Sequence, residues 1–133
     1  MDETYKYADL THTIIGSAME VHRYLGNGFQ ELIYQRALAI ELGIRKINFT
    51  REQEMVVFYK EVEVGTRRAD FFIEGKIMVE LKAIIQLEEV QLAQALNYLE
   101  AYNIETGLLI NFGARSLQHK RLLNKKYKPD RDL

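Results

Sequence analysis

The sequence predicts an α/β fold in which helices flank a mixed β-sheet. Apolar residues recur at helical spacing in the N-terminal third, strand-like segments follow, and a further helical segment separates two strongly apolar runs. A helix that connects neighbouring strands places them parallel, whereas short connections favour antiparallel pairing. The 133 residues include no low-complexity linker, and their single proline is Pro129, so we expect one domain over residues 1–133.

Two helices are expected first. The first should span residues 9–25, with Asp9 as its N-cap and Gly26 as its stop. Its apolar residues share one helical face: Leu10, Ile14, Ala18, Val21 and Leu25. The second should span residues 30–42, with Gly43 ending it. Together they predict a helical hairpin ahead of the sheet.

Strand periodicity begins after this pair of helices. A helix over residues 88–102 then connects two apolar strands, which we therefore expect to be parallel neighbours. The last segment, residues 118–123, is either a strand or a short helix. The expected strands are 55–59, 62–64, 68–73, 77–84 and 106–112, and those before the connecting helix form an antiparallel meander.

Two opposite charges lie inside an apolar strand, Ile77-Met78-Val79-Glu80-Leu81-Lys82-Ala83-Ile84. Alternation places Glu80 and Lys82 on one face of it. Burying charge is costly unless the charge is paired or bound to a metal. One interpretation is a surface ion pair on an edge strand. The other is a functional site, completed by Asp70 in the preceding apolar strand.

The connection between these strands decides whether Asp70 and Glu80 meet. A two-residue loop at Glu74-Gly75 would turn the two carboxylates to opposite faces. A three-residue loop, residues 74–76, pairs Ile73 with Ile77 and sets Asp70 opposite Glu80. Gly75 suits the left-handed position that such loops need, so we predict this loop or an equivalent bulge.

The three charged residues together predict phosphodiester hydrolysis. Asp70 and Glu80 are the expected metal ligands, because neighbouring carboxylates bind a hard cation such as Mg²⁺ (or Mn²⁺). Such an ion activates water and neutralises charge on a phosphate. Lys82 would orient the attacking water and stabilise developing negative charge.

Two further pairs of residues accompany this set. Glu31 and Tyr34 lie three residues apart on one helical face, and Glu31 alone could simply favour the helix N-terminus. Gln94 and Tyr98 lie four apart on the later helix, where they could also be part of a polar stripe.

These residues together resemble the GxxExxY protein family of the PD-(D/E)XK nuclease superfamily. The resemblance runs from about Leu10 to Gly113 and includes Gly28-Phe29-Gln30-Glu31-Leu32-Ile33-Tyr34, Asp70, Val79-Glu80-Leu81-Lys82, residues 94–99 and residues 107–113. It implies a restriction-endonuclease-like αβββαβ core, with Asp70 and Glu80 as metal ligands and Lys82 as the catalytic lysine.

The resemblance assigns the other residues around that centre. It implies that Glu31 is an acidic residue beside the metal and that Gln94 and Tyr98 line the substrate groove, with Tyr34 expected nearby. His22 either faces the site or is a core histidine whose hydrogen bonds are satisfied.

The expected activity is a metal-dependent nuclease acting on DNA. The alternative is a nuclease-fold binding or accessory module with little turnover, which the net charge of −1 and the small size favour. Another phosphodiester substrate is a third option. A lone domain of this size suggests a homodimer or a protein partner. Residues 114–133 form a basic extension, either a solvated tail or a phosphate-contacting patch. Absent cysteines and the lack of a long apolar run indicate a cytoplasmic protein without a membrane segment.

Overall fold

A computed structural model describes residues 6–129 of the chain as three helices and a five-stranded mixed sheet. The strands follow one another in the sheet in the same order as in the sequence. The elements are α1 (Ala8–Leu25), α2 (Glu31–Ile44), β1 (Phe49–Tyr59), β2 (Val62–Ile73), β3 (Ile77–Lys82), α3 (Glu89–Tyr102), β4 (Thr106–Asn111) and β5 (Gln118–Leu123). The predicted α/β class with a mixed sheet is confirmed.

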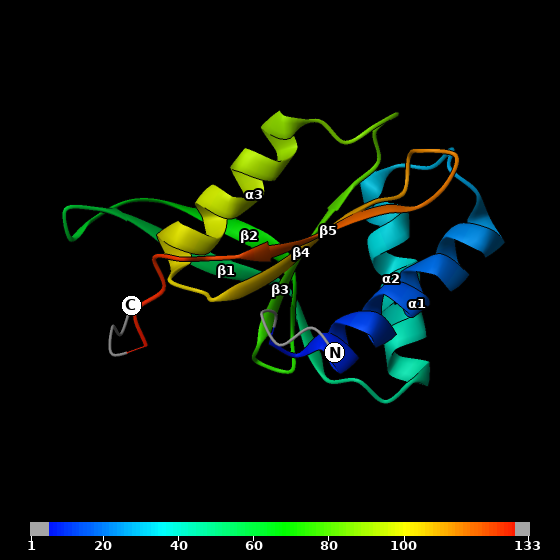
Figure 1. The fold of residues 1–133 in the computed structure, drawn as a ribbon, viewed down its shortest axis with the longest axis horizontal. Helices are drawn as coiled ribbons and strands as arrows, with labels where there is room; N and C mark the ends of the chain where they lie inside the picture. Colours follow the sequence, from blue (N-terminus) through cyan, green and yellow to red (C-terminus); the bar gives the residue numbers. More distant parts are fainter. Residues whose placement is uncertain (1–5, 130–133) are drawn as a thin grey trace.

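The sheet separates two hydrophobic cores. α1 and α2 pack on one face of it, against side chains such as Phe71 and Val79, while α3 covers the other face, against Met78 and Leu109 (Figure 1). The alternation of Met78 and Val79 between the two cores shows that β3 is buried on both faces. Strands buried in this way read as continuous apolar runs, which explains the sequence of this strand.

Two predicted strands merge in the structure. Residues 62–64 and 68–73 belong to one strand, β2, and β1 begins at Phe49 rather than at Met55. Backbone pairing between β1 and β2 continues through polar positions such as Glu54, opposite Arg68. The segments that the prediction missed, residues 49–54 and 65–67, are mostly exposed and polar, so they leave only a weak sequence signal.

The strands after the hairpin pair as expected. β3 and β4 are parallel neighbours joined through α3, as predicted. Residues 118–123 adopt the strand alternative and pair antiparallel with β4. Part of the predicted basic extension is therefore an edge strand of the sheet. β3 ends at Lys82 and β4 at Asn111, each slightly earlier than expected.

The predicted start of α1 and the predicted end of α2 need correction. Tyr7, not Asp9, is the N-cap of α1, and Asp9 lies in the first turn, where its charge favours the helix dipole. Gly26 does end α1, with φ 79°. Gly43 does not end α2; Lys46 adopts the left-handed conformation instead (φ 60°), and its N–H bonds the Gly43 carbonyl at 3.0 Å.

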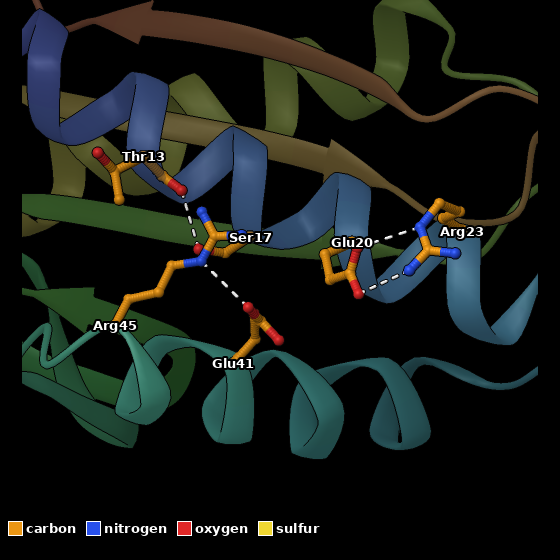
Figure 2. A network of polar contacts seen from close by, with 6 residues as sticks. All are labelled: Thr13, Ser17, Glu20, Arg23, Glu41 and Arg45. Carbon is orange, nitrogen blue, oxygen red and sulfur yellow. Dashed lines mark hydrogen bonds and ion pairs between the residues drawn. The ribbon is translucent and has the colours of Figure 1, made fainter.

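Polar contacts run along the surfaces of α1 and α2 where the two helices meet (Figure 2). Arg45 of the α2 C-terminus bonds Glu41 at 3.1 Å, and its guanidinium lies close to α1: a Cβ added to Gly16 would be 3.4 Å from Arg45 Nη1. On α1, Glu20 forms a two-point contact with Arg23. Gly16 thus leaves room for an ion pair at the junction of the two helices.

Within residues 6–129, no helix combines the length and the apolar character that crossing a membrane requires.

Candidate active site

The β2–β3 hairpin has the predicted three-residue loop. Ile73 pairs with Ile77, and the Lys76 N–H closes the turn on the Ile73 carbonyl at 2.9 Å. Glu74 and Gly75 both have positive φ, 55° and 64°. Gly75 adopts this conformation without a Cβ penalty. The register required to bring Asp70 toward Glu80 is therefore present.

Beyond the paired part of the β2–β3 hairpin, hydrogen bonds from side chains replace the backbone hydrogen bonds between the two strands. The last paired residues are Phe71 and Val79. One step further, the Asp70 N–H donates to Glu80 Oε2 at 3.3 Å, and the Leu81 N–H donates to Asp70 Oδ2 at 2.8 Å. Each carboxylate thus bonds the backbone of the opposite strand. The two acids lie next to each other in the gap between β2 and β3.

The two carboxylates receive their other partners from opposite layers. Gln35 of α2 donates to Asp70 Oδ1 at 2.8 Å. Arg67 of β2 forms an ion pair with Glu80, and its guanidinium stacks 3.6 Å from the ring centroid of Tyr98 on α3. The expectation of one common face is therefore met only in part, because the acids are adjacent but contacted from both sides of the sheet.

Burial dominates the electrostatics of Glu80. The residue is 2% exposed, and burial raises the pKa of its carboxyl, which the neighbouring Asp70 charge raises further. Arg67 opposes this rise through its hydrogen bond and charge. Burial likewise works against the charged guanidinium, yet the contact with Glu80 outweighs it, and the net pKa of Arg67 is raised. A cation next to Glu80 is thus what makes its ionised form tolerable.

The charges of Asp70 and Lys82 both act on the pKa of Glu31. Glu31 begins α2, and its pKa is raised by partial burial and by the Asp70 charge, while Lys82 works in the opposite direction. One acid of α2 thus interacts electrostatically with Asp70 of β2 and with Lys82 of β3. Together with Glu80, which bonds the Asp70 backbone, these residues form the charged cluster: Glu31, Asp70, Glu80 and Lys82.

The end of β3 is clamped onto β4. The buried Asn111 side chain bonds both backbone groups of Ile84, accepting from its N–H and donating to its carbonyl, each at 2.9 Å. Gly113 packs so close that an added Cβ would lie 2.3 Å from the Ile84 carbonyl oxygen. The Phe112 N–H also bonds the Lys82 carbonyl at 2.8 Å. This clamp fixes the backbone that carries Lys82.

Tyr34 lies in the core, so its predicted place beside a substrate groove is wrong. It is fully buried and stacks on Phe112 with centroids 4.6 Å apart. Its hydroxyl donates to the Gly26 carbonyl at 2.6 Å and accepts from the Phe29 N–H at 3.1 Å. Tyr34 therefore holds the turn that precedes Glu31.

His22 takes the second of its two expected roles. Its Nε2 lies 3.0 Å from the Ala114 carbonyl oxygen, and its ring lies beside Phe112. This half-buried histidine has its hydrogen bond satisfied by the connection between β4 and β5. It fastens α1 to that connection and does not contact the carboxylates.

The two groove residues of α3 lie differently. Tyr98 reaches the charged cluster by stacking on Arg67. Gln94 is exposed and lines a shallow hollow on the outer surface of α3 together with Val90 and Asn97. The helical stripe that joins Gln94 and Tyr98 thus extends from the cluster toward solvent.

Sequence reasoning missed two residues that contact the charged cluster, Arg67 and Gln35. Arg67 falls in a stretch of β2 with little apolar periodicity, so its partner could not be inferred. Gln35 is 4% exposed. A glutamine that follows Tyr34 and lies four residues after Glu31 was the available signal, because it extends the polar face of α2.

The donor set suits a hard divalent cation. Mg²⁺ is commonly held by one or two carboxylates, with water completing its shell. A carboxylate offers about four lone-pair sites, and Asp70 uses two of them for Gln35 and Leu81. Within the described part of the chain, no group of three or more His, Cys, Asp and Glu side chains could hold a metal. Asp70 and Glu80 would thus offer such an ion two carboxylates, with no third side chain of these kinds grouped with them in the described residues.

A family model described as the PD-(D/E)XK nuclease superfamily matches residues 8–122. The chain belongs to this superfamily. The match covers every helix and all of the sheet except the last residue of β5, and includes all four members of the charged cluster. The mixed sheet with its flanking helices agrees with the restriction-endonuclease-like core. Membership supports a nuclease-type function. No curated protein matches the chain.

Proposed function

We propose that the protein is a metal-dependent nuclease that hydrolyses phosphodiester bonds in DNA. The observation that carries this proposal is the interlocking of Asp70 and Glu80 across the opened β2–β3 pair, with Lys82 and Glu31 beside them. Superfamily membership supports hydrolysis of a nucleic acid. The cofactor is Mg²⁺ or Mn²⁺.

Each member of the cluster has a role in this proposal. Asp70 and Glu80 hold the ion, which when bound supplies Lewis acidity and activated water. Gln35 and the Leu81 N–H fix the orientation of Asp70. Lys82 orients the attacking water and stabilises the negative charge that develops on the phosphate. Glu31, whose charge interacts with Asp70 and Lys82, exchanges protons with water at the site.

The GxxExxY family is the proposed subgroup, on the basis of Gly28, Glu31 and Tyr34. In this protein the motif combines one residue of the charged cluster with one that supports the turn before it. We further propose that the protein acts in the cytoplasm, either as a homodimer or with a protein partner that enlarges its contact with DNA.

Cleavage assays test the proposal. Purified protein is incubated with linear, nicked and single-stranded DNA in the presence of Mg²⁺, Mn²⁺ or EDTA. We expect cleavage that requires the metal and that Lys82→Ala lowers by about 100-fold or more. Lys76→Ala is the matched control, because it removes the same charge from the exposed loop of the hairpin. Equal activity in both variants, or no cleavage of any substrate, contradicts the proposal.

A second function has one specific observation in its favour. Glu80 is already neutralised by Arg67, as expected for a binding module whose acid serves only a structural role. Such a module binds DNA without regard to divalent metal and does not cleave it. Calorimetric titration of DNA into the protein, with and without Mg²⁺, separates this function from the first.

A further inference from the structure

Arg67 lies directly on one of the two proposed metal ligands. Its Nη2 forms an ion pair with Glu80 Oε1, while Glu80 Oε2 accepts from the Asp70 N–H. The Glu80 side chain is 3% exposed and that of Arg67 is 28% exposed. The arginine therefore covers the carboxylate and keeps a route to solvent for itself.

An aromatic ring holds the arginine in this place. The guanidinium stacks on Tyr98 at 3.6 Å, a geometry that favours a cation. Its Nη1 is buried without a hydrogen bond of good geometry in the described chain, although the Tyr102 hydroxyl lies near enough to favour the charged form. One guanidinium nitrogen of Arg67, Nη1, thus lacks a well-formed hydrogen bond within the described residues.

A divalent ion and Arg67 cannot both neutralise Glu80 fully. Two cations on one buried carboxylate repel each other strongly, because the interior screens charge poorly. The carboxylate itself requires one of them, since an unpaired buried charge is costly. Binding of either cation therefore weakens binding of the other.

We propose that Arg67 is a positioning residue that competes with the divalent ion for Glu80, so that the site takes up metal as Arg67 withdraws. This inference rests on the proposed function, in which Glu80 is a metal ligand. The partly exposed side chain then turns toward solvent with its guanidinium free, a group that binds phosphate oxygens in pairs. Metal uptake thereby frees the Arg67 guanidinium to contact the phosphates of an approaching nucleic acid.

Titration of Mn²⁺ into the full-length protein tests the competition without any cleavage measurement. The free Mn²⁺ is followed by electron paramagnetic resonance. We expect Arg67→Gln to bind Mn²⁺ at least about 5-fold more tightly than the unaltered protein. Arg68→Gln is the matched control, because the neighbouring arginine is exposed and loses the same charge. Its Mn²⁺ affinity should stay within about 2-fold of the unaltered protein.

A second variant covers the case in which Arg67→Gln does not fold. Tyr98→Leu removes the stacked ring and leaves the arginine charge in place. Loss of the cation–π contact destabilises the position of the Arg67 guanidinium next to Glu80, so Mn²⁺ affinity should rise by about 2-fold or more. Circular dichroism confirms folding of each variant.

The outcomes separate this inference from the proposed nuclease function. The competition is overturned if folded Arg67→Gln or Tyr98→Leu protein binds Mn²⁺ with unchanged or weaker affinity. If Asp70→Asn still abolishes Mn²⁺ binding in that case, the metal site itself stands. Absence of Mn²⁺ binding in all variants overturns both. Tighter binding in Arg67→Gln without cleavage of any DNA supports the competition and rejects the nuclease.

Discussion

The carboxylate of Asp70 accepts a hydrogen bond from the Leu81 N–H at 2.8 Å, one residue beyond Glu80 on the neighbouring strand. With Gln35 donating to its other oxygen, Asp70 faces two donors at once. An ionised carboxylate satisfies both, since it is purely an acceptor. The strands are thus held together at the site by the side chain that is expected to bind metal.

Asp70→Asn should impair both folding and metal binding. An amide presents an NH₂ group to one of the two donors and leaves it unsatisfied, which costs about 1–3 kcal/mol in the free energy of unfolding. Urea denaturation measures this loss, and Mn²⁺ titration measures the loss of the ion. Asp9→Asn, at an exposed position in the first turn of α1, is the control: it should leave Mn²⁺ affinity unchanged and lower the free energy of unfolding only by its helix-dipole contribution, about 0.3–1 kcal/mol. A fully stable Asp70→Asn variant would show that the two hydrogen bonds contribute little.

Lys82→Met should separate chemistry from stability. The side chain is half-buried at the end of β3, so the methionine keeps its apolar stem and loses only the ammonium group. We expect cleavage to fall by about 100-fold or more while Mn²⁺ affinity is retained. Single-turnover cleavage with excess enzyme gives the chemical rate. A normal rate in this variant would remove Lys82 from the mechanism.

Gly113→Ala should strongly destabilise the protein. The added Cβ would lie 2.3 Å from the Ile84 carbonyl oxygen and 2.4 Å from the Ile84 nitrogen, and backbone cannot move aside cheaply. A loss of about 3 kcal/mol or more is expected in thermal or urea unfolding.

Gly43→Ala provides the opposite control. A Cβ there meets nothing within 4 Å, and the residue lies inside α2. The substitution should raise the free energy of unfolding by about 0.5–1 kcal/mol, because alanine favours the helix. If both alanine variants behaved alike, close packing at Gly113 would not be the cause.

Tyr34→Phe should affect stability and leave the chemistry unchanged. The variant loses hydrogen bonds to Gly26 and Phe29, and each contributes about 0.5–1.5 kcal/mol. Tyr24→Phe is the control, since that ring is 80% exposed. Urea unfolding and Mn²⁺ affinity are measured together. A large fall in metal affinity without loss of stability would return Tyr34 to the site.

Glu31 should make stability depend on pH in a defined direction. Its folded pKa is raised above the ordinary value of 4.5, so between these two values the folded protein binds more protons than the unfolded chain. Its contribution to the free energy of unfolding is therefore largest below pH 4.5 and declines as the pH rises through the folded pKa. The difference in stability between the unaltered protein and Glu31→Gln, measured by urea unfolding from pH 4 to pH 8, should fall with rising pH. A constant difference would mean that the pKa is not raised.

The sequence predicted those parts of the molecule where local chemistry and burial agree. The loop at Gly75 and the parallel pairing of β3 with β4 follow from turn residues and a connecting helix, and both are confirmed. The site residues Asp70, Glu80 and Lys82 were inferred because charge inside an apolar strand is exceptional. Their catalytic roles stay predictions.

Other features depend on tertiary partners that leave no local pattern. Arg67 looks like an exposed strand residue until Tyr98, distant in sequence, provides its stacking surface. Tyr34 was expected beside a groove because Glu31 shares its helical face, yet a short rotation around α2 directs Glu31 to the charged cluster and Tyr34 to Phe112. Periodicity assigns a face, but only packing determines what that face touches.

The strand order β1-β2-β3-β4-β5 has a consequence for how the site is assembled during folding. Each strand pairs with its neighbour in the chain, and the parallel pairing of β3 with β4, which spans α3, needs the longest loop closure. The helical hairpin lies outside this order of strands and docks on one face of the sheet. Gln35 and Glu31 arrive only with that docking, so a chain whose sheet has formed but whose helices are still detached has no complete cluster.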